Sequence, residues 1–416
     1  MIREREEKKE KIRLVEKRMW KFSQVITGRP NPDRYEINAA IIGITIRGLK
    51  GTYVLENFLG TGSFGDVFKV SIMNTSQDFA LKIAPYDNRS LLEAEAYNRL
   101  RDCGENVVCA YDIFIYTEKD GRKWLVIVQE LLDIDLFDYR PKSHEMSTII
   151  MDLLSGVSCI NSKGIAHKDI KAENMFMVKR ERKIFKIGDP GLVCSRITSP
   201  EKYTSIKTCT MTGTYLPPDL VKTKEISDPI DFPTALSIDS WDLGLYFYQA
   251  LVLMGFLDRS TLDMMRTKYN GNFPPDYKIP VELPNNVDFG KISPEVISNI
   301  LKYLLTYDSE KRPTAHETLK YIVLKMGWAE PGQEDTYLEK NTKTSTCSAE
   351  LSPIVHSIVT PPISPPSSRE ISPEPSPEPS REASPETSRE ASPEPEIQTT
   401  AIPGRILKPI YRLPKV

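Results

Sequence analysis

The order of two patterns along the chain restricts the possible fold more than any other feature of the sequence. From about residue 35 to 130, short apolar and β-branched runs alternate with turn residues, and one helix-like segment, Ser90 to Arg101, interrupts them. From about residue 146 to 328, apolar residues instead recur at helical spacing. We therefore expect an α+β, bilobal fold, with a small β-rich lobe followed by a larger helical lobe.

The strand-like part contains five apolar or β-branched runs. They are Ala39 to Ile46, Tyr53 to Leu55, Asp66 to Val70, Phe79 to Ile83 and Leu125 to Val128. The segment Lys119 to Arg122 predicts a hairpin turn before the last run, because its Asp-Gly pair adopts such turns readily.

In the helical part, two apolar stripes predict helices that bury one face. The stripes are Ile149, Leu153, Val157 and Ile160, and then Ile297, Leu301 and Leu304. The most apolar long stretch, Leu243 to Leu257, is shorter than a membrane span requires. We therefore expect a buried core helix there and no transmembrane segment.

We predict three regions along the chain. Residues 1–34 form a charged helical extension, and residues 35–328 form the folded domain, with lobes at about 35–132 and 133–328. Residues 329–416 form a Ser/Pro/Glu-rich tail that we expect to be disordered, because it has few apolar side chains to offset the entropy of ordering. The tail is either a phosphorylatable regulatory segment, since several serines precede prolines, or an inert linker.

Composition narrows the class of protein further. The 55 Lys and Arg residues nearly balance the 57 Asp and Glu residues, which argues against nucleic-acid binding through bulk positive charge. The 6 cysteines include no C-x-x-C pair and there are only 4 histidines, so we expect neither a disulfide framework nor a zinc site. The charged N-terminus does not resemble a signal peptide. These features favour an intracellular location, cytoplasmic or nuclear.

The first chemical motif is a glycine-rich turn between two strands. Gly60, Gly62 and Gly65 follow one strand-like run and precede another, Val67 to Val70. A dinucleotide-binding loop has the same glycine spacing, but a helix follows it. A glycine-rich hairpin is therefore expected, whose amides can approach phosphates because no Cβ atoms block them.

A lysine inside an apolar strand is the second motif. Lys82 lies within Phe79-Ala-Leu-Lys-Ile, where its charge needs a partner. Glu93 on the following helix is favoured, because Ala96 and Tyr97 continue its apolar face. Glu95 remains an alternative, although the residues that follow it on its face are polar.

The most specific motif is the string His167-Lys-Asp-Ile-Lys-Ala-Glu-Asn174. It brings together a carboxylate, an ammonium and an amide, and each suits phosphoryl transfer. The carboxylate can orient an attacking hydroxyl and accept its proton, the ammonium can steady a phosphate, and the amide oxygen can hold a metal. Asp189-Pro-Gly follows the next apolar run and supplies a second possible Mg²⁺ ligand.

Together these motifs resemble those of the eukaryotic-type protein kinase family over roughly residues 50–328. The resemblance implies a protein-kinase-like fold that transfers the γ-phosphate of ATP to protein substrates, with Mg²⁺ as the metal. It implies that Asp169, Lys171 and Asn174 are catalytic, and that Asn174 and Asp189 hold the metal.

The resemblance also implies how the nucleotide is bound. The run from Val126 to Leu132 is similar to the hinge of mitogen-activated kinases, with Gln129 at the gatekeeper position. Backbone groups of Glu130 and Leu132 would pair with adenine, and Asp135 would contact the ribose. Val67, Ala80 and Phe176 would enclose the ring. The residues expected to contact or support the nucleotide are Leu59, Gly60, Gly62, Gly65, Val67, Ala80, Lys82, Glu93, Glu130, Leu132, Asp135 and Phe176.

Two structural roles follow from the same resemblance. Asp219, in an element similar to the family's Ala-Pro-Glu motif, is expected to pair with Arg312. Asp239 is expected to support the catalytic loop, His167 to Asn174, from the side away from the substrate.

The chain departs from the family pattern at three positions. Pro190 replaces the usual phenylalanine after the metal-binding aspartate, which removes an amide donor and a large apolar side chain. Lys168 replaces an arginine and cannot bind a phosphate through two parallel bonds. Aspartate at Asp219 replaces a glutamate and shortens the reach toward Arg312.

Two hypotheses about function follow. The first is a working serine/threonine kinase, because the charged groups for the chemistry are present and Lys171 and Thr214 match the serine/threonine branch. The second is a pseudokinase that acts as a nucleotide-binding scaffold, suggested by Pro190 and the long tail. Protein substrates are the expected partners, and the oligomeric state is left open.

Overall fold

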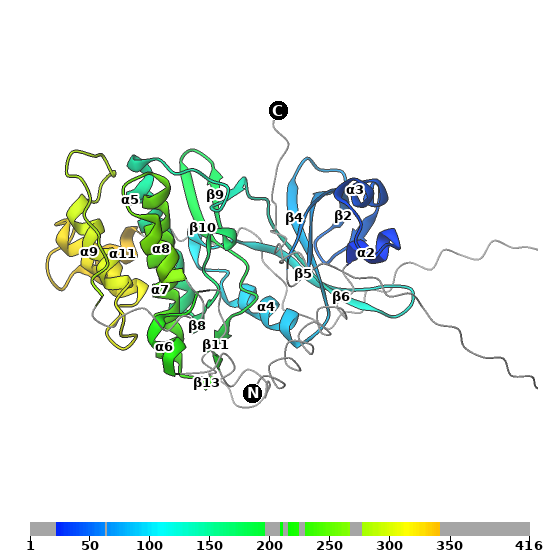
Figure 1. Cartoon of the computed structure of the whole chain (residues 1–416). Helices are drawn as coiled ribbons and strands as arrows, with labels where there is room; N and C mark the ends of the chain where they lie inside the picture. Colours follow the sequence, from blue (N-terminus) through cyan, green and yellow to red (C-terminus); the bar gives the residue numbers. More distant parts are fainter. Residues whose placement is uncertain are drawn as a thin grey trace, which may run out of the picture. The chain divides into compact units, whose positions relative to one another are not determined.

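The computed structural model describes residues 22–62, 65–195, 209–210, 215–223, 229–266 and 277–341. The first lobe is built on a six-stranded antiparallel sheet, which Figure 1 shows beside helices α2 and α3. In spatial order, its strands are β1 (Thr45–Arg47), β2 (Thr52–Thr61), β3 (Asp66–Ile72), β4 (Asp78–Pro85), β6 (Lys123–Glu130) and β5 (Ala110–Thr117).

Four of the five predicted strand runs lie in this sheet, and the hairpin turn is confirmed. Gly121 has φ +87 and donates its backbone N–H to the carbonyl of Glu118, between β5 and β6. The prediction for Ala39 to Ile46 is wrong in its first half, because helix α3 (Arg34–Ile41) occupies it. Asp33 and Glu36 form a capping box that starts this helix.

The described part of the predicted N-terminal extension belongs to this lobe. Helix α2 (Phe22–Thr27) buries Phe22 against Phe68 and Trp124, with ring centroids 5.9 and 5.7 Å apart. Helix α3 adds Ile37 to the same apolar cluster. The fold therefore begins before residue 35, where we had placed the boundary; residues 1–21 lie outside the described residues.

The second lobe contributes three small sheets and most of the helices. Strands β10 (Lys183–Ile187), β9 (Met175–Lys179) and β7 (Ile134–Asp135) form one sheet, and the pairs β11 (Cys194–Ser195) with β8 (Ile165–Ala166) and β12 (Cys209–Thr210) with β13 (Pro229–Ile230) form the others. The helices after α3 are α4 (Asn88–Arg99) in the first lobe, and then α5 (Met146–Ser162), α6 (Pro218–Thr223), α7 (Phe232–Leu253), α8 (Arg259–Arg266), α9 (Pro294–Leu304), α10 (Ala315–Lys325) and α11 (Glu334–Asn341). Short 3₁₀ turns span Gly104–Asn106, Ser143–Glu145 and Ala172–Asn174.

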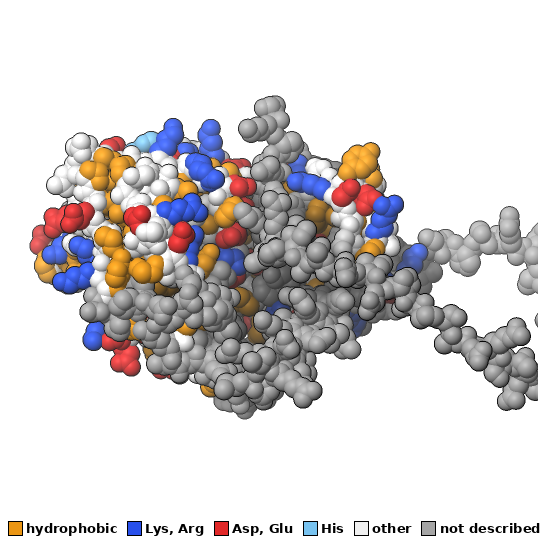
Figure 2. Space-filling model, viewed as in Figure 1, with side chains coloured by type: hydrophobic (Ala, Val, Ile, Leu, Met, Phe, Trp, Pro, Cys, Tyr) orange, Lys and Arg blue, Asp and Glu red, His pale blue; other side chains and the backbone are white. Residues whose placement is uncertain are grey.

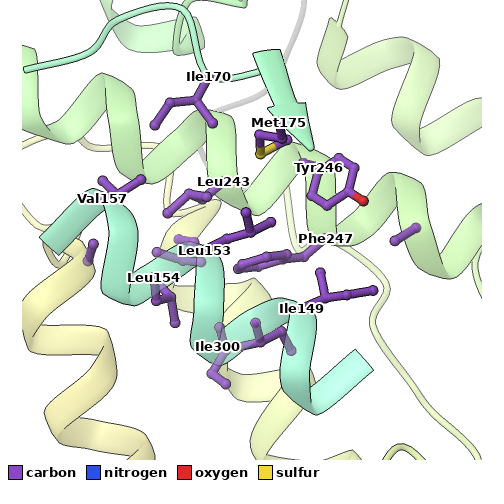
Figure 3. Packing of buried hydrophobic residues seen from close by; sticks show 14 of the residues in the cluster. Ile149, Leu153, Leu154, Val157, Ile170, Met175, Leu243, Tyr246, Phe247 and Ile300 are labelled. Atoms are coloured by element: carbon purple, nitrogen blue, oxygen red, sulfur yellow. The ribbon is translucent and has the colours of Figure 1, made fainter. Parts of the chain in front are cut away.

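Both predicted apolar stripes point into one large core. Figure 3 shows Leu153 and Val157 of α5 beside Leu243 and Phe247 of α7, with Ile300 of α9 below them. All five side chains are fully buried. As expected, α7 is a buried core helix, and among the described residues no helix has the length and apolarity needed to cross a bilayer.

The folded domain extends past the predicted boundary at residue 328. Helix α11 (Glu334–Asn341) packs on α10, where Leu338 is 9% exposed and the Tyr337 ring stacks on Trp328 at 6.3 Å. Apolar residues are sparse around α11, so composition did not separate it from the tail. The rest of the predicted tail lies outside the described residues.

A disulfide joins Cys103, just after α4, to Cys159 on α5. The expectation that cysteines form no disulfides is therefore wrong for this pair. Their separation of 56 residues carries no local sequence signal, and only the packing of the 3₁₀ turn Gly104–Asn106 against α5 places their Cα atoms 5.5 Å apart. The cysteines therefore no longer support the expected intracellular location.

The described surface carries charges of both signs. Figure 2 shows Lys and Arg side chains interspersed with Asp and Glu over both described portions of the face in view. This mixture agrees with the near-balance of charge in the whole sequence.

Candidate active site

Lys82 lies between two carboxylates that come from different lobes. Its Nζ is 2.6 Å from Glu93 Oε1 on α4 and 2.6 Å from Asp189 Oδ1, which follows β10. Glu93 is 1% exposed, whereas Glu95 is exposed to solvent, so the choice of Glu93 as partner is confirmed. One ammonium thus links the strand, the helix and the proposed metal segment.

The electrostatics of this cluster follow from one cation shared by two anions. Burial alone would lower the pKa of Lys82, but Asp189 and Glu93 together raise it above its ordinary value. Burial would raise the pKa of Asp189, yet Lys82, together with His167 and Lys171, holds it below its usual range. Burial raises the pKa of Glu93. The attraction of Lys82 lowers it by less, because Lys82 also pairs with Asp189. Asp189 is therefore the carboxylate that stays ionised most readily.

The three predicted catalytic residues converge on one carboxylate. Asp169 Oδ2 accepts hydrogen bonds from Lys171 Nζ at 2.8 Å and from Asn174 Nδ2 at 2.9 Å. The Asn174 amide also donates to the Asp169 carbonyl. Asp169 is only 3% exposed, so these donors fix its orientation and offset the cost of burying its charge.

Asp239 of α7 braces the catalytic loop, as expected. Its carboxylate accepts from the backbone N–H of His167 at 2.9 Å, from that of Lys168 at 2.7 Å, and from the Asn161 side chain at 3.0 Å. Lys168 has φ 60, a backbone conformation that non-glycine residues rarely adopt. The buried carboxylate thus holds an unfavourable turn in place.

The two predicted metal ligands lie on neighbouring backbone segments. The Gly188 N–H donates to the Asn174 carbonyl at 2.9 Å, directly before Asp189. Because its Nδ2 is directed at Asp169, the Asn174 amide oxygen is turned the other way. A carboxylate held ionised and an amide oxygen are donors that Mg²⁺ accepts, with phosphate and water oxygens completing its shell. The residues therefore fit a divalent metal bound together with a nucleotide.

Two of the residues predicted to enclose the adenine, Val67 and Ala80, lie in one small apolar cluster. Leu59, which we expect to contact the nucleotide, packs with them, and Leu131 joins them although we had not predicted it. Phe176 is also buried, on β9. Their contacts with adenine stay predictions.

The acidic side chain of the hinge, Glu130, is partly buried and has three partners. Glu130 Oε1 accepts from the Cys109 N–H at 2.9 Å and pairs with Lys186 Nζ at 2.8 Å, while its Oε2 pairs with Arg180 at 3.1 Å. These bonds restrain the backbone around Glu130 and Leu132, which we expect to pair with adenine.

Asp135 has a structural role that the sequence did not indicate. It is 1% exposed, and its Oδ1 accepts from the Asp138 N–H at 2.8 Å. Burial raises its pKa to about 6, despite that hydrogen bond. This orientation serves a backbone turn, so the ribose contact stays a prediction.

The glycine-rich hairpin is closed at its base, and its tip, residues 63–64, lies outside the described residues. The Gly62 N–H donates to the Gly65 carbonyl at 2.8 Å, and Gly60 pairs with Val67 across β2 and β3. A Cβ atom at Gly65 would lie 2.3 Å from the Ile83 carbonyl oxygen, so only glycine fits there. The hairpin and the strand that follows it are therefore confirmed.

A bond between helix α4 and the gatekeeper was not predicted. The Tyr97 hydroxyl donates to Gln129 Oε1 at 2.9 Å, and both side chains are buried. Tyr97 lies one turn after Glu93, so this bond restrains the same helix that orients Lys82. The sequence placed Tyr97 on the apolar face of α4 but gave no partner for its hydroxyl.

The predicted pair Asp219 and Arg312 is present, but the contact is long. The closest oxygen and nitrogen are 3.7 Å apart, as expected for the shorter aspartate. Arg312 instead directs its guanidinium to the backbone carbonyls of Ser237, Thr306 and Tyr307. Burial lowers its pKa to about 10, even though Asp219 opposes this.

Comparison with known proteins decides the family. The sequence model described as "Protein kinase domain" matches residues 53–323. The chain belongs to the protein kinase family. Both the bilobal fold and the arrangement of Lys82, Asp169 and Asp189 agree with this membership.

Similar kinases come from several eukaryotes. The chain is 29% identical over 283 residues to the membrane-associated tyrosine- and threonine-specific cdc2-inhibitory kinase wee-1.3 of Caenorhabditis elegans, a match that covers 66% of this chain and 37% of that relative. It is 26% identical over 280 residues to the serine/threonine-protein kinase ppk16 of Schizosaccharomyces pombe, covering 66% and 38%. It is 27% identical over 334 residues to the mitogen-activated protein kinase mpkC of Aspergillus oryzae, covering 73% and 90%.

The matched part is thus less than half the length of the first two relatives. Their names differ in the acceptor residue, since one includes tyrosine and the other does not. Membership in the kinase family therefore does not by itself define the acceptor for this chain.

Proposed function

We propose that this protein is a serine/threonine protein kinase, which transfers the γ-phosphate of ATP to protein hydroxyls in the presence of Mg²⁺. The observation that carries the proposal is the buried carboxylate of Asp169, which is oriented by Lys171 and Asn174. It stands beside a complete set of charged groups around Lys82.

The proposed reaction is a single in-line displacement. Asp169 orients the acceptor hydroxyl and takes its proton as the new oxygen–phosphorus bond forms and the bond to ADP breaks. Lys171 steadies the transferred phosphoryl group, and Lys82 contacts the α- and β-phosphates while Glu93 orients it. The chemistry that a bound Mg²⁺ supplies is neutralisation of charge on the phosphate oxygens, and Asn174 and Asp189 would hold it.

Two features support serine and threonine as acceptors. Lys171, two residues after Asp169, contacts that carboxylate, and a lysine in this place is typical of the serine/threonine branch. Thr214, the other expected marker, lies outside the described residues. The relative ppk16 is named as a serine/threonine kinase. Dual specificity is a second candidate, because wee-1.3 is named for tyrosine and threonine.

The test uses three peptides that differ only in a Ser, Thr or Tyr acceptor. Full-length protein with ATP and Mg²⁺ should label the Ser and Thr peptides and leave the Tyr peptide unlabelled. Labelling of the Tyr peptide at a similar rate would replace the proposal with dual specificity.

The matched control is Asp169→Asn, which keeps the shape of the side chain but removes the base. It should bind nucleotide and transfer almost no phosphate. If wild-type protein binds nucleotide but labels no peptide and not itself, the pseudokinase alternative is correct.

A further inference from the structure

The segment that precedes the family-matched region touches the glycine-rich hairpin at two points. The matched region begins at residue 53, yet residues 22–47 form helices α2 and α3 and strand β1. The Phe58 N–H of β2 donates to Asn38 Oδ1 of α3 at 2.7 Å, next to an irregularity in the β2–β3 pairing. A shifted pairing leaves a backbone donor without its strand partner, and Asn38 supplies the acceptor.

The second point lies at the base of the phosphate-binding turn. Asp66 directly follows Gly65 and is 0% exposed. Its Oδ2 accepts from the Ser23 N–H of α2 at 2.7 Å, and its Oδ1 accepts from the Thr61 hydroxyl. One carboxylate therefore joins the two strands of the hairpin to each other and to the N-terminal segment.

The chemistry of this junction explains why an acidic residue suits it. Ser23 is the second residue of a helix, so its N–H has no acceptor within the helix. A carboxylate satisfies that donor with a charge-assisted bond, which is stronger than a neutral one. The junction is held from the other side as well, because Phe22 packs between Phe68 and Trp124.

We propose that Asp66 is a positioning residue for the nucleotide, which fastens the glycine-rich hairpin to the N-terminal segment and thereby sets the affinity for ATP. The inference rests on the proposed kinase function, since it assumes that the hairpin amides meet the phosphates. If the base of the hairpin is released, its amides must be ordered on binding, and ordering costs affinity. The proton-accepting side of the site, at Asp169, is untouched.

The experiment compares variants of the full chain by nucleotide binding and by kinetics. Asp66→Ala removes both contacts, and Ser23→Pro removes the backbone donor together with the Ser23 hydroxyl, at a position in the first helical turn where proline is tolerated. Ser23→Pro should raise the Kd for Mg-ADP and the KM for ATP about threefold to tenfold, in keeping with the loss of one charge-assisted bond. Asp66→Ala should raise them at least as much, because it also loses the contact with Thr61. The kcat at saturating ATP should change less than about twofold.

Two controls should bind nucleotide like wild type: Ser23→Ala keeps the backbone donor, and Tyr35→Ala changes a side chain that is 83% exposed on the same segment. Asp66→Asn can still accept from Ser23 and donate to the Thr61 hydroxyl but lacks the charge, so its affinity should lie between those of Asp66→Ala and wild type. Thermal unfolding without nucleotide identifies any variant that does not fold. If Asp66→Ala fails to fold, the pair Ser23→Pro and Ser23→Ala decides.

The outcomes separate this inference from the function on which it rests. If wild-type protein binds Mg-ADP and the folded Asp66→Ala and Ser23→Pro variants bind it equally well, the inference is wrong and the kinase proposal stands. A fall in kcat with unchanged KM would also overturn it. If wild-type protein binds no nucleotide, the proposed function itself fails.

Discussion

The catalytic loop and helix α4 hold their functional carboxylates in different ways. The loop that carries Asp169 is fixed by Asp239 of the core helix α7. The Asp239 side chain is fully buried, and its carboxylate accepts hydrogen bonds from two backbone N–H groups of the loop. Helix α4, which carries Glu93, is tied to the site by two side-chain bonds, one to Lys82 and one from Tyr97 to Gln129.

The loop that carries Asp169 is therefore the rigid part of the site, and helix α4 is the part that can shift. Backbone donors bonded to a buried acid can move only if the core of the second lobe moves. Side-chain bonds can break while the sheet and α4 stay folded. Changes near α4 should therefore alter turnover more than stability, and changes that reach the second-lobe core should alter both.

The largest effect is expected where the two regions meet. Asp189→Asn removes the anion that pairs with Lys82 and that would hold the metal, so turnover should fall at least about a thousandfold, or about 4 kcal/mol. The fold should persist, because the amide can still accept from Lys82. A peptide phosphorylation assay with a thermal melt measures both. Wild-type turnover in this variant would refute the metal assignment, and Asp120→Asn in the exposed hairpin turn serves as the control.

The second-largest effect is expected for Lys82→Met, which should lower turnover about tenfold to a hundredfold. It removes a charge-assisted contact worth about 1.5–3 kcal/mol and frees Glu93 from its cation. Glu93→Gln in the same chain should recover stability without recovering turnover, because the methionine cannot bind phosphate. Undiminished activity of Lys82→Met would mean that another lysine performs this role.

Truncation tests the stability of the second lobe, which holds the rigid part of the site. A chain that ends at Asn341 should keep its stability and its turnover on a generic substrate. A chain that ends at Trp328 loses α11 with Leu338, and also the pairing of Asp335 with Lys320, so it should unfold at a lower temperature. Burial of one such leucine contributes about 1.5–3 kcal/mol. Equal melting temperatures for the two chains would show that α11 adds nothing to the domain.

A smaller change tests how helix α4 is positioned. Tyr97→Phe removes only the hydroxyl bonded to Gln129, a bond worth about 1 kcal/mol. Turnover should fall about threefold to tenfold, while the melting temperature changes little. In a double-mutant cycle with Gln129→Leu, the two losses should not add, because both remove the same bond. Additive losses would mean that the bond does not position α4.

The smallest effect concerns Asp135. Burial raises its pKa in the folded state from 3.8 to about 6, so its ionised form costs stability. That cost is absent below the unfolded pKa, grows as the pH rises through this interval and is constant above it. Asp135→Asn should therefore gain stability relative to wild type between pH 4 and pH 7, as measured by denaturant unfolding. A raised KM for ATP in this variant would support the ribose contact instead.

Local patterns in the amino-acid sequence were enough to predict the α+β order, the glycine hairpin, the partner of Lys82 and the string His167 to Asn174. These features depend on short spacings, and a residue's neighbours within a strand or a helical turn decide which side chains share a face. For the same reason, the spacing around Glu93 favoured it correctly over Glu95. The roles of these residues toward ATP are carried by the family resemblance.

Contacts between groups far apart in the chain could be seen only in the assembled fold. The disulfide of Cys103, the bond from Tyr97 to Gln129 and the bond from Ser23 to Asp66 each join residues far apart in the chain, where spacing carries no information. Packing also overrode local pattern at the start of the Ala39 to Ile46 run, where a capped helix buries its apolar residues against the sheet. Such contacts form only after the elements are assembled, because their free energy comes from burial and from donors and acceptors that the local chain leaves unsatisfied.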